Sequence, residues 1–239
     1  MTALVRSTVN PEMIELVQLS VILPTLNAAH CVARSLAAVN RPPMVVERLV
    51  VDGGSQDETL PIAEAAGAKI VKSQKGRGIQ LAAGAAAATG DWFLFLHADT
   101  VLDPGWEDEA CRFIANAGSA GAAVFRFALD DRSAAAARLE TLVAWRCRAL
   151  ALPYGDQGLL ISRQFYEALG GYKPIPLYED VDIIRRVGRN RLTLLETRAV
   201  TSAARYRQSG YFRRPMRNLM CLALYRLGIP PHMLARIYG

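Results

Sequence analysis

The sequence predicts an α/β protein with a doubly wound, mostly parallel sheet flanked by helices and followed by a helical C-terminal appendage. In the first half, strand-like runs alternate with helical runs of about ten to fifteen residues, as in parallel strands joined by crossover helices. Hydrophobic residues make up 51% of the 239 positions, enough for one large core. Neither a repeat nor a low-complexity linker divides the chain. We therefore expect one main domain, residues 1–204, and a basic appendage, residues 205–239.

Four runs in the first half are typical of strands, and polar residues mark the helix starts between them. The expected strands cover residues 16–24, 46–52, 68–73 and 91–99. Asn27 is placed to cap the helix after the first strand, and Ser55 and Glu58 have capping-box spacing after the second. The small residues of 78–90 predict a helix that packs closely on the sheet.

The second half is less regular, and two of its loops carry polar residues. Expected helices cover 104–116 and 133–150, with strands at 122–129 and, as one or two strands, within 191–203. The loop "LPYGDQG" enters a short strand, and "GGYKPIPLYED" delivers Glu179 and Asp180 to the start of a helix. A mainly helical tail follows these elements.

Composition limits the location and the metal chemistry. No apolar run is long enough to span a membrane, and the N-terminus lacks the features of a signal peptide. We therefore expect a cytoplasmic protein, either free or bound to the inner face of the membrane. The four cysteines are scattered without a CxxC motif, which favours buried free thiols over a zinc site or a disulfide framework.

The chain has a net charge of +6, and its basic character is concentrated in the tail. No Asp or Glu follows Glu196, whereas eight arginines do: Arg198, Arg205, Arg207, Arg213, Arg214, Arg217, Arg226 and Arg236. An apolar stripe that includes Leu219 and Leu227 accompanies them, and it fits either ordinary packing or contact with an anionic membrane. Without a nucleic-acid-binding motif or interleaved aromatic residues, we expect no nucleic-acid partner.

Polar residues gather where strands end, which is where doubly wound sheets bind ligands. They are Pro24, Thr25 and Asn27; Asp52 and Asp57; His97 and Asp99; and, before the late helix, Glu179 and Asp180. Asp99, at the end of a buried strand, suits Mg²⁺ or Mn²⁺ that takes its other ligands from a diphosphate, although it also suits a turn cap. His97 points to the same face and fits a ribose contact, a metal ligand or a packed core histidine.

These residues lie in blocks that resemble the inverting family 2 glycosyltransferases of GT-A fold. The blocks are "SVILPTLNAA", "LVVDGGSQDETLPIAEAAGAKIV", "GRGIQLAAGAAAATGDWFLFLHADT", "YGDQGLLISRQFYEALGGY" and "YEDVDIIRRV". They are most similar to a bacterial subgroup whose metal motif reads His-Ala-Asp. The resemblance covers about Leu19 to Arg205 and implies a catalytic domain over 1–204.

The resemblance also implies roles for these residues. Pro24, Thr25 and Asn27 line the nucleotide pocket, and Asp52 hydrogen-bonds the base or ribose. Asp99 binds the metal, and Asp180 is the general base on the acceptor hydroxyl. The donor is then a nucleoside-diphosphate sugar, with UDP favoured, and the acceptor is a lipid or a small molecule.

The remaining candidates come from the chemistry of transfer. Inverting transfer needs positive charge on the leaving diphosphate and a base at the attacking hydroxyl. Arg77, beside glycines at a helix start, is a candidate phosphate contact, and Glu179 is the alternative base. Asp156 and Gln157 are candidates for the acceptor side. Arg205 or Arg207 is placed to close over the diphosphate.

Three departures from the family pattern keep other interpretations open. His97 replaces the first aspartate of the Asp-x-Asp motif, Gly53 stands where a second aspartate often follows the strand, and the Gln-x-x-Arg-Trp motif is absent, which argues against a processive synthase. A catalytically weak nucleotide-binding protein is one alternative. A nucleotidyltransferase or a methyltransferase is another, although the first strand lacks the Gly-rich turn that both use.

Overall fold

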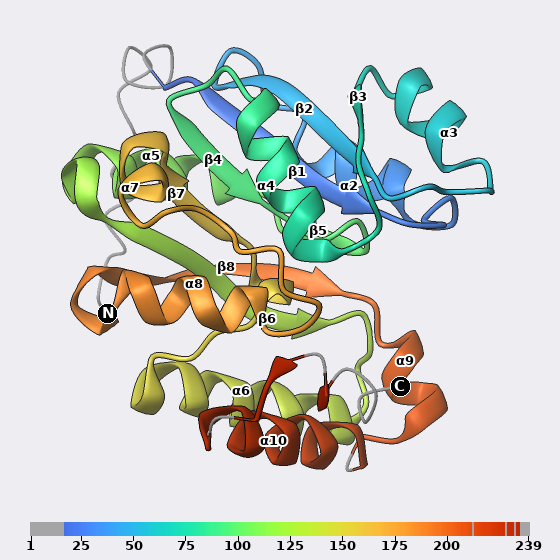
Figure 1. Cartoon of the computed structure of the whole chain (residues 1–239), viewed down its shortest axis with the longest axis vertical. Coiled ribbons are helices and arrows are strands. Elements are labelled where there is room, and N and C mark those ends of the chain that lie inside the picture. Colours follow the sequence, from blue (N-terminus) through green and yellow to red (C-terminus); the bar gives the residue numbers. More distant parts are fainter. Residues whose placement is uncertain (1–16, 212, 228, 232, 235–239) are drawn as a thin grey trace, which may run out of the picture.

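The computed structural model describes residues 17–211, 213–227, 229–231 and 233–234. In that part of the chain, eight strands form one twisted sheet with the order β3-β2-β1-β4-β7-β6-β8-β5 (Figure 1). The strands are β1 (Leu19–Thr25), β2 (Val45–Asp52), β3 (Lys69–Lys72), β4 (Trp92–Phe95), β5 (Thr100–Leu102), β6 (Ala122–Leu129), β7 (Leu159–Ser162) and β8 (Leu192–Thr201). Four of the seven pairings are parallel, which confirms a mostly parallel sheet.

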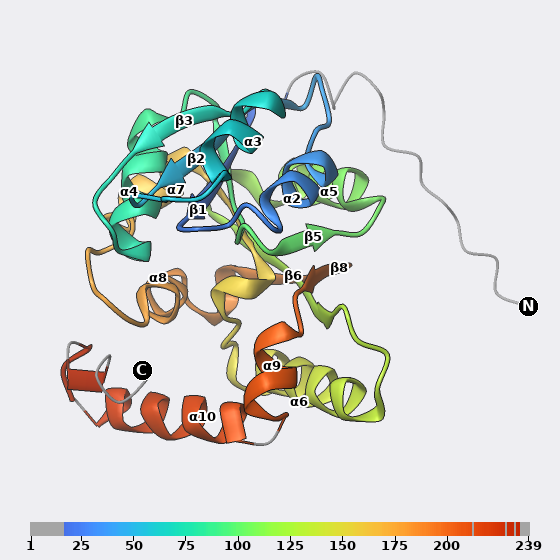
Figure 2. The ribbon, with the colours of Figure 1, turned by 90° about the vertical axis from the view of Figure 1, so that its right-hand side faces the viewer.

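Helices cover both faces of this sheet (Figure 2). The α-helices are α2 (Val32–Ala38), α3 (Thr59–Ala65), α4 (Arg77–Ala87), α5 (Trp106–Ala117), α6 (Ala134–Leu150), α7 (Arg163–Ala168), α8 (Glu179–Val187), α9 (Ala204–Ser209) and α10 (Arg213–Arg226) within the described ranges. Short 3-10 turns, η1 (Gly118–Ala120), η2 (Gly155–Gln157) and η3 (Arg189–Arg191), join some of them. No described helix combines the length and the apolar character needed to cross a bilayer.

The pleat of the strands builds two cores, because successive side chains of a strand point to opposite faces of the sheet. Along β1, Val21 and Leu23 pack with α2, α3 and α5, whereas Ile22 packs with α4, α7 and α8 on the other face. Helix α4 approaches the sheet through Gly84, where a methyl group would lie 2.4 Å from Ile22 Cγ2 and 2.7 Å from Val51 Cγ2. The small-residue helix expected at this place therefore packs closely because glycine faces the strands.

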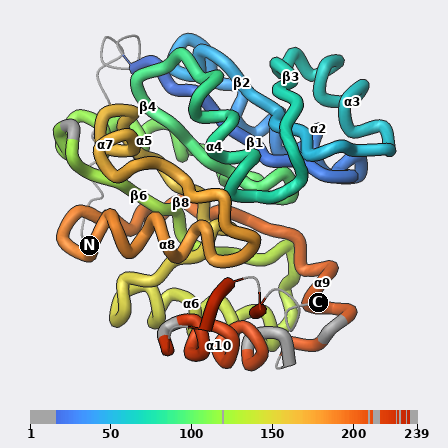
Figure 3. The backbone as a smooth tube through the Cα atoms, viewed as in Figure 1, coloured from blue at the N-terminus to red at the C-terminus, as the bar shows by residue number. Residues whose placement is uncertain are grey.

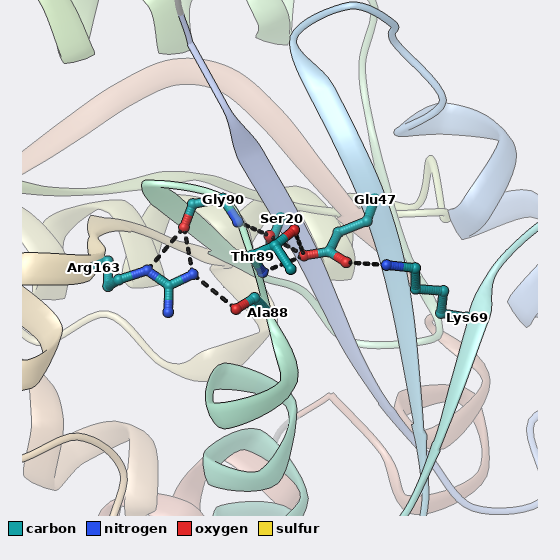
Figure 4. A network of polar contacts seen from close by, with 7 residues as sticks. All are labelled: Ser20, Glu47, Lys69, Ala88, Thr89, Gly90 and Arg163. Atoms are coloured by element: carbon teal, nitrogen blue, oxygen red, sulfur yellow. Dashed lines mark hydrogen bonds and ion pairs between the residues drawn. The ribbon is translucent and has the colours of Figure 1, made fainter.

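A polar network fixes the turn between α4 and β4 (Figure 4). The buried Glu47 carboxylate accepts hydrogen bonds from Ser20 Oγ at 2.7 Å, from Lys69 Nζ at 2.9 Å and from the backbone and hydroxyl of Thr89. Arg163 donates to Gly90 O at 2.7 Å and to Ala88 O at 2.8 Å. The turn is thus held from two sides at the end of β4 opposite to the polar strand ends.

The helix starts differ from two sequence predictions. Asn27 does not cap α2, which begins at Val32 after Cys31; its backbone is left-handed, with φ of 52°, and its Oδ1 accepts from Gln56 N at 2.9 Å. Ser55 makes no capping box with Glu58, because its hydroxyl donates to Asp52. Both side chains serve the loops beside the strand ends instead.

The far end of the molecule is built by α6, α9 and α10 (Figure 3). Arg207 lies 3.7 Å from both Asp130 and Asp131, and Tyr211 donates a hydrogen bond to Asp131, which ties the start of the tail to the β6–α6 loop. All four cysteines are free, as expected, and Cys31 is the one that is only partly buried. Arg236 lies outside the described residues.

Candidate active site

The carboxyl ends of β1, β2 and β4 meet at one edge of the sheet, and η2 and the start of α8 approach the same edge. A small cavity lies there, with Arg77, His97, Gly155, Tyr172, Glu179 and Asp180 among its lining residues. These residues come from sequence blocks that are far apart in the chain. The structure therefore brings four of the predicted residues, Arg77, His97, Glu179 and Asp180, to one cavity.

His97 and Asp99 lie in a turn after β4, not on the strand, which ends at Phe95. Thr100 N donates to His97 O at 3.1 Å, and Ser35 Oγ donates to Ala98 O at 2.7 Å. The alternation of a strand therefore does not set the directions of His97 and Asp99, and the prediction that both point to one strand face is wrong. The hydrogen bond from α2 holds the turn in place instead.

The His97 ring lies against η2. A methyl group on Gly155 would come within 2.8 Å of His97 Nε2 and 3.4 Å of Asp180 Oδ2, so a residue without a side chain is required between them. Burial lowers the pKa of His97 well below its usual range, and the charges of Arg77 and Arg205 lower it further. His97 is thus a neutral imidazole at pH 7, able to accept a hydrogen bond or to bind a metal.

Side chains of α6 contact the turn Tyr154–Gln157 and hold it in place. Cys147 Sγ donates to Gln157 Oε1 at 3.1 Å, and the Arg146 guanidinium lies 3.7 Å from the centre of the Tyr154 ring. Gln157 is buried and donates to Phe125 O at 2.9 Å, so its amide supports the turn rather than facing a ligand. Of the two residues predicted for the acceptor side, Asp156 and Gln157, only Asp156 therefore has a side-chain oxygen available to a ligand.

Asp156 carries unmet hydrogen-bonding capacity. Its Oδ1 is buried without a hydrogen-bond partner among the described residues. Burial raises its pKa to about 6, the charges of Asp180 and Asp99 also raise it, and Arg146 and Arg77 oppose the rise. A buried polar atom without a partner is costly, and such atoms are concentrated at functional sites.

The two carboxylates at the start of α8 have different surroundings. Asp180 Oδ2 accepts from Gly155 N at 2.7 Å, and its Oδ1 accepts from Val181 N at 2.7 Å. Glu179 is buried and its Oε1 lies 3.3 Å from Arg77 Nη1. Burial and the Asp180 charge raise the pKa of Glu179, whereas Arg77 opposes the rise.

Carboxylates of like charge therefore share this edge. Asp99 is partly buried and its charge acts on both Asp156 and Cys31. No group of three or more His, Cys, Asp or Glu side chains in the described part of the chain forms a ready metal site. The carboxylate oxygens of this edge fit a hard divalent cation that keeps open positions for ligand oxygens.

The predicted nucleotide side surrounds Asp52. Its Oδ2 accepts from Gly54 N and Ser55 N at 2.9 Å each, and its Oδ1 accepts from Ser55 Oγ and from Thr25 Oγ1. Burial opposes ionisation, but these hydrogen bonds outweigh it and lower the pKa of Asp52. Asp52 thus organises the turn after β2, next to the half-buried Pro24 at the end of β1.

The structure also explains the glycine that follows Asp52. A methyl group on Gly53 would lie 3.1 Å from the Gln80 amide, which donates at 2.8 Å to both Thr25 O and Val51 O. Gln80 occupies the space that an aspartate at 53 would need. The buried Gln80 amide of α4 therefore explains why this chain has glycine at position 53 where the family often has aspartate.

Arg205 and Tyr172 join the site without having been among the main candidates. Thr201 of β8 pairs with Thr100, so α9 begins beside the turn that holds Asp99, and the Arg205 charge acts on His97 and Cys31. Burial, and then the Asp180 charge, raise the pKa of Tyr172 well above its usual range. Nothing in the local pattern "GGY" indicates a role for Tyr172, because only the fold brings it to Asp180.

Comparison with known proteins gives a family and a set of structural relatives. The family model described as "Glycosyl transferase family 2" matches residues 20–166. Comparison with curated proteins gives no match. Three crystal structures of glucosyl-3-phosphoglycerate synthase from Mycobacterium tuberculosis are similar in fold, and their bound groups differ.

The first, with Mn²⁺ and UDP-glucose, has a TM-score of 0.68 and 22% identity over 94% of this chain and 86% of that one. The second, with Mn²⁺, UDP and glucosyl-3-phosphoglycerate, has a TM-score of 0.67 and 20% identity over 95% and 88%. The third, with Mg²⁺ and UDP, has a TM-score of 0.67 and 21% identity over 94% and 86%. They confirm the expected GT-A fold. Because the family model covers more than half of the sequence, the chain belongs to glycosyl transferase family 2 and is a glycosyltransferase.

Proposed function

We propose that this enzyme transfers one sugar at a time from a UDP-sugar to an acceptor hydroxyl, with inversion at the anomeric carbon. The observation that carries the proposal is the grouping of Asp99, Asp156 and Asp180 around the Tyr154–Gln157 turn, with Arg77 beside them. The structural relatives, which bind UDP or UDP-glucose, support a uridine nucleotide. The missing Gln-x-x-Arg-Trp motif supports single transfers.

Asp180 is the proposed general base. Inversion requires the hydroxyl to attack on the face opposite to the departing diphosphate, where a carboxylate takes its proton. The backbone N–H groups of Gly155 and Val181 each hold one Asp180 oxygen, so the carboxylate is kept in one orientation. Glu179 instead pairs with Arg77, and this pair positions the guanidinium. The structure thereby favours Asp180 over Glu179.

Asp99 is the proposed ligand of Mg²⁺ or Mn²⁺, with His97 as a second ligand. The carboxylates around it repel one another, and a divalent cation relieves that repulsion. When bound, the cation supplies positive charge to the leaving diphosphate. Structural relatives that contain Mn²⁺ or Mg²⁺ with UDP support this choice of metal.

The donor side combines a shaped turn with two guanidinium groups. Pro24, Thr25 and Asn27 line the nucleoside pocket, and Asp52 acts through the turn that it organises. Arg77, at the start of α4, contacts the phosphates. Arg205 completes this contact, because Arg207 is already held by Asp130 and Asp131.

The acceptor side is proposed to use Asp156. Its Oδ1 needs a donor, and an acceptor hydroxyl group supplies one while lying close to Asp180. Gln157 contributes by holding the turn. The domain division at residue 204, the cytoplasmic location and an acceptor that is a lipid or a small molecule are parts of the same proposal.

Thermal unfolding with nucleotides tests the proposal first. A ligand that binds only the folded state stabilises it by RT ln(1 + [L]/Kd). We expect UDP with Mn²⁺ to raise the melting temperature more than GDP, CDP or dTDP, and Asp99→Asn to lose that effect. Asp103→Asn, an exposed aspartate on the next loop, is the matched control. If no nucleotide stabilises wild type with metal, the protein is not a nucleotide-sugar transferase.

A further inference from the structure

Exposed hydrophobic side chains gather at one end of the molecule. Of the ten large hydrophobic side chains that are exposed in the described part of the chain, eight lie on α6, on α10 or in the residues after α10. Both helices lie at the end farthest from β3 and α3, as two perpendicular views show (Figures 1 and 2). We name this surface the α6–α10 end. Such a concentration indicates an interaction surface rather than scattered exposure.

Helix α6 has a buried face and an exposed face. Leu139, Val143 and Cys147 are buried against β6 and the tail, whereas Leu142 is 54% exposed and Trp145 is 59% exposed. Beside Trp145, an open groove of about 690 Å³ is lined by Arg126, Arg148 and one carboxylate, Glu140, among other residues. The outward face therefore presents an indole with guanidinium groups at its border.

Helix α10 repeats this arrangement. Cys221 and Leu222 are buried, whereas Met216, Leu219 and Met220 are each about half exposed, at 50%, 57% and 49%. Their spacing of three and four residues places them on one side of the helix. Leu227, just after the helix, is 80% exposed. The predicted apolar stripe is thus divided, with Leu222 used for packing and Leu219 left at the surface.

The net charge of this end is positive. By sequence, α6 and α10 together carry seven arginines and one glutamate, and one of these arginines, Arg146, lies against the Tyr154 ring on the inner side of α6. The glutamate, Glu140, accepts a hydrogen bond from Leu129 N at 2.8 Å. Arg138 and Arg148 are exposed, and their side chains form no ion pair with described residues. The partner of this surface is therefore both anionic and able to take up apolar side chains.

We propose that the α6–α10 end docks on an anionic lipid bilayer. Helices with arginines beside exposed Trp, Leu and Met side chains lie in the plane of a membrane interface. A second copy of the chain fits less well, because a two-fold interface would bring the same arginine-rich surface against itself. The inference includes α6, which the sequence did not mark as a contact surface, and it rests on exposure and charge rather than on the proposed sugar transfer.

Vesicle sedimentation tests the proposal with the full chain. We expect binding to phosphatidylcholine vesicles that contain phosphatidylglycerol, and little binding to phosphatidylcholine alone. Leu142→Ser/Trp145→Ser should lower the binding constant by on the order of tenfold or more. Val46→Ser, which changes an exposed hydrophobic residue of β2, should leave it unchanged. Arg138→Ala/Arg148→Ala should weaken binding at low salt more than Lys72→Ala/Arg112→Ala does.

Two further measurements decide the result. Trp145 fluorescence should shift to shorter wavelength with anionic vesicles, and Trp145→Phe should remove that shift. The proposal is overturned if wild type ignores anionic vesicles, if the Leu142/Trp145 variant binds as well as wild type, or if lipid-free sedimentation shows a dimer that this variant dissociates. Stabilisation by UDP with Mn²⁺ should persist in the Leu142/Trp145 variant. A negative vesicle result would therefore leave the proposed sugar transfer standing, and a negative nucleotide result would leave the membrane proposal standing.

Discussion

Two acidic groups near opposite ends of the same sheet have opposite surroundings. Glu47 accepts hydrogen bonds from Ser20, Lys69 and Thr89; burial opposes its ionisation, yet these contacts lower its pKa to about 2 (Figure 4). Asp156 has a buried oxygen without a partner among the described residues, and burial raises its pKa to about 6. The Glu47 carboxylate finds its hydrogen-bond donors within the folded chain. The Asp156 Oδ1 atom has no donor among the described residues and needs one from a bound molecule.

This difference separates stability from function in one fold. A carboxylate with all of its hydrogen bonds stabilises the folded state, and one that lacks them raises its energy. The Glu47 network fixes the start of β4, and the unmet groups lie beyond the end of the same strand. Substitutions of Glu47 and Asp156 should therefore change stability in opposite directions, and only those of Asp156 should also change activity.

The largest effect should come from Asp180→Asn. Removing the proposed base should lower kcat about 10²- to 10⁴-fold, because general base catalysis contributes that much. Donor affinity should change little, and the melting temperature should fall only by the loss of one backbone hydrogen bond, because Asn has one acceptor oxygen where Asp180 has two. Asp182→Asn, on the same helix but paired with Lys173 and Arg186, is the matched control. Equal kcat for wild type and Asp180→Asn would exclude Asp180 as the base.

Glu47→Gln should show the reverse pattern. The lowered pKa of Glu47 gives stability that is fully present above its ordinary pKa of 4.5 and is lost as pH falls toward about 2. The variant should lose about 3 kcal/mol of unfolding free energy at pH 7 and less at pH 3, while kcat of the folded enzyme is retained. Urea denaturation at both pH values measures this difference. A loss that is the same at both would refute the assignment to Glu47 ionisation.

Asp156→Asn should stabilise the protein while it impairs transfer. The raised pKa of Asp156 means that its ionisation costs stability, and the cost appears as pH rises from the ordinary 3.8 through about 6. Without divalent metal, the variant should gain about 2–3 kcal/mol at pH 7 and nothing below pH about 4. Denaturation across this pH range measures the gain. A variant that is less stable than wild type at pH 7 would contradict the conclusion that the Asp156 carboxylate lacks a hydrogen-bond partner.

The smallest effect should separate two arginines on one helix. Arg205→Ala should raise KM for the donor by on the order of tenfold with unchanged stability, since one charged hydrogen bond is lost. Arg207→Ala should instead lower the melting temperature slightly, because it breaks only exposed ion pairs with Asp130 and Asp131. Steady-state kinetics and calorimetry of both variants compare them. Equal KM values would place Arg205 outside the donor site.

Much of the fold follows from local pattern. The alternation of strand and helix predicted the parallel half of the sheet, and the helix expected over 133–150 is α6, which Ser133 caps by accepting from Ala136 N. Local pattern did not predict β5 or the end of β4 at Phe95. β5 depends on its pairing with β8, which is about a hundred residues away, and β4 ends where its pairing with β1 and β7 ends.

The site was predicted unevenly for the same reason. Asp99 and Asp180 follow from strand ends and the family resemblance, and the structure brings both near Asp156. The roles of Ser55 and Gln157 inside turns were not predicted, because they depend on partners that only the fold supplies. Tyr172 was missed because its neighbours come from α7 and α8.

Helix α6 has one further consequence, because its inner residues Arg146 and Cys147 hold the Tyr154–Gln157 turn and its outer residues Leu142 and Trp145 form the exposed surface. The two regions are thus separated by the width of a single helix. If occupation of the outer surface shifts α6 and changes acceptor affinity by some factor, thermodynamic reciprocity requires the acceptor to change affinity at the outer surface by the same factor. The acceptor would then influence where the enzyme resides, and the place where it resides would influence its use of the acceptor.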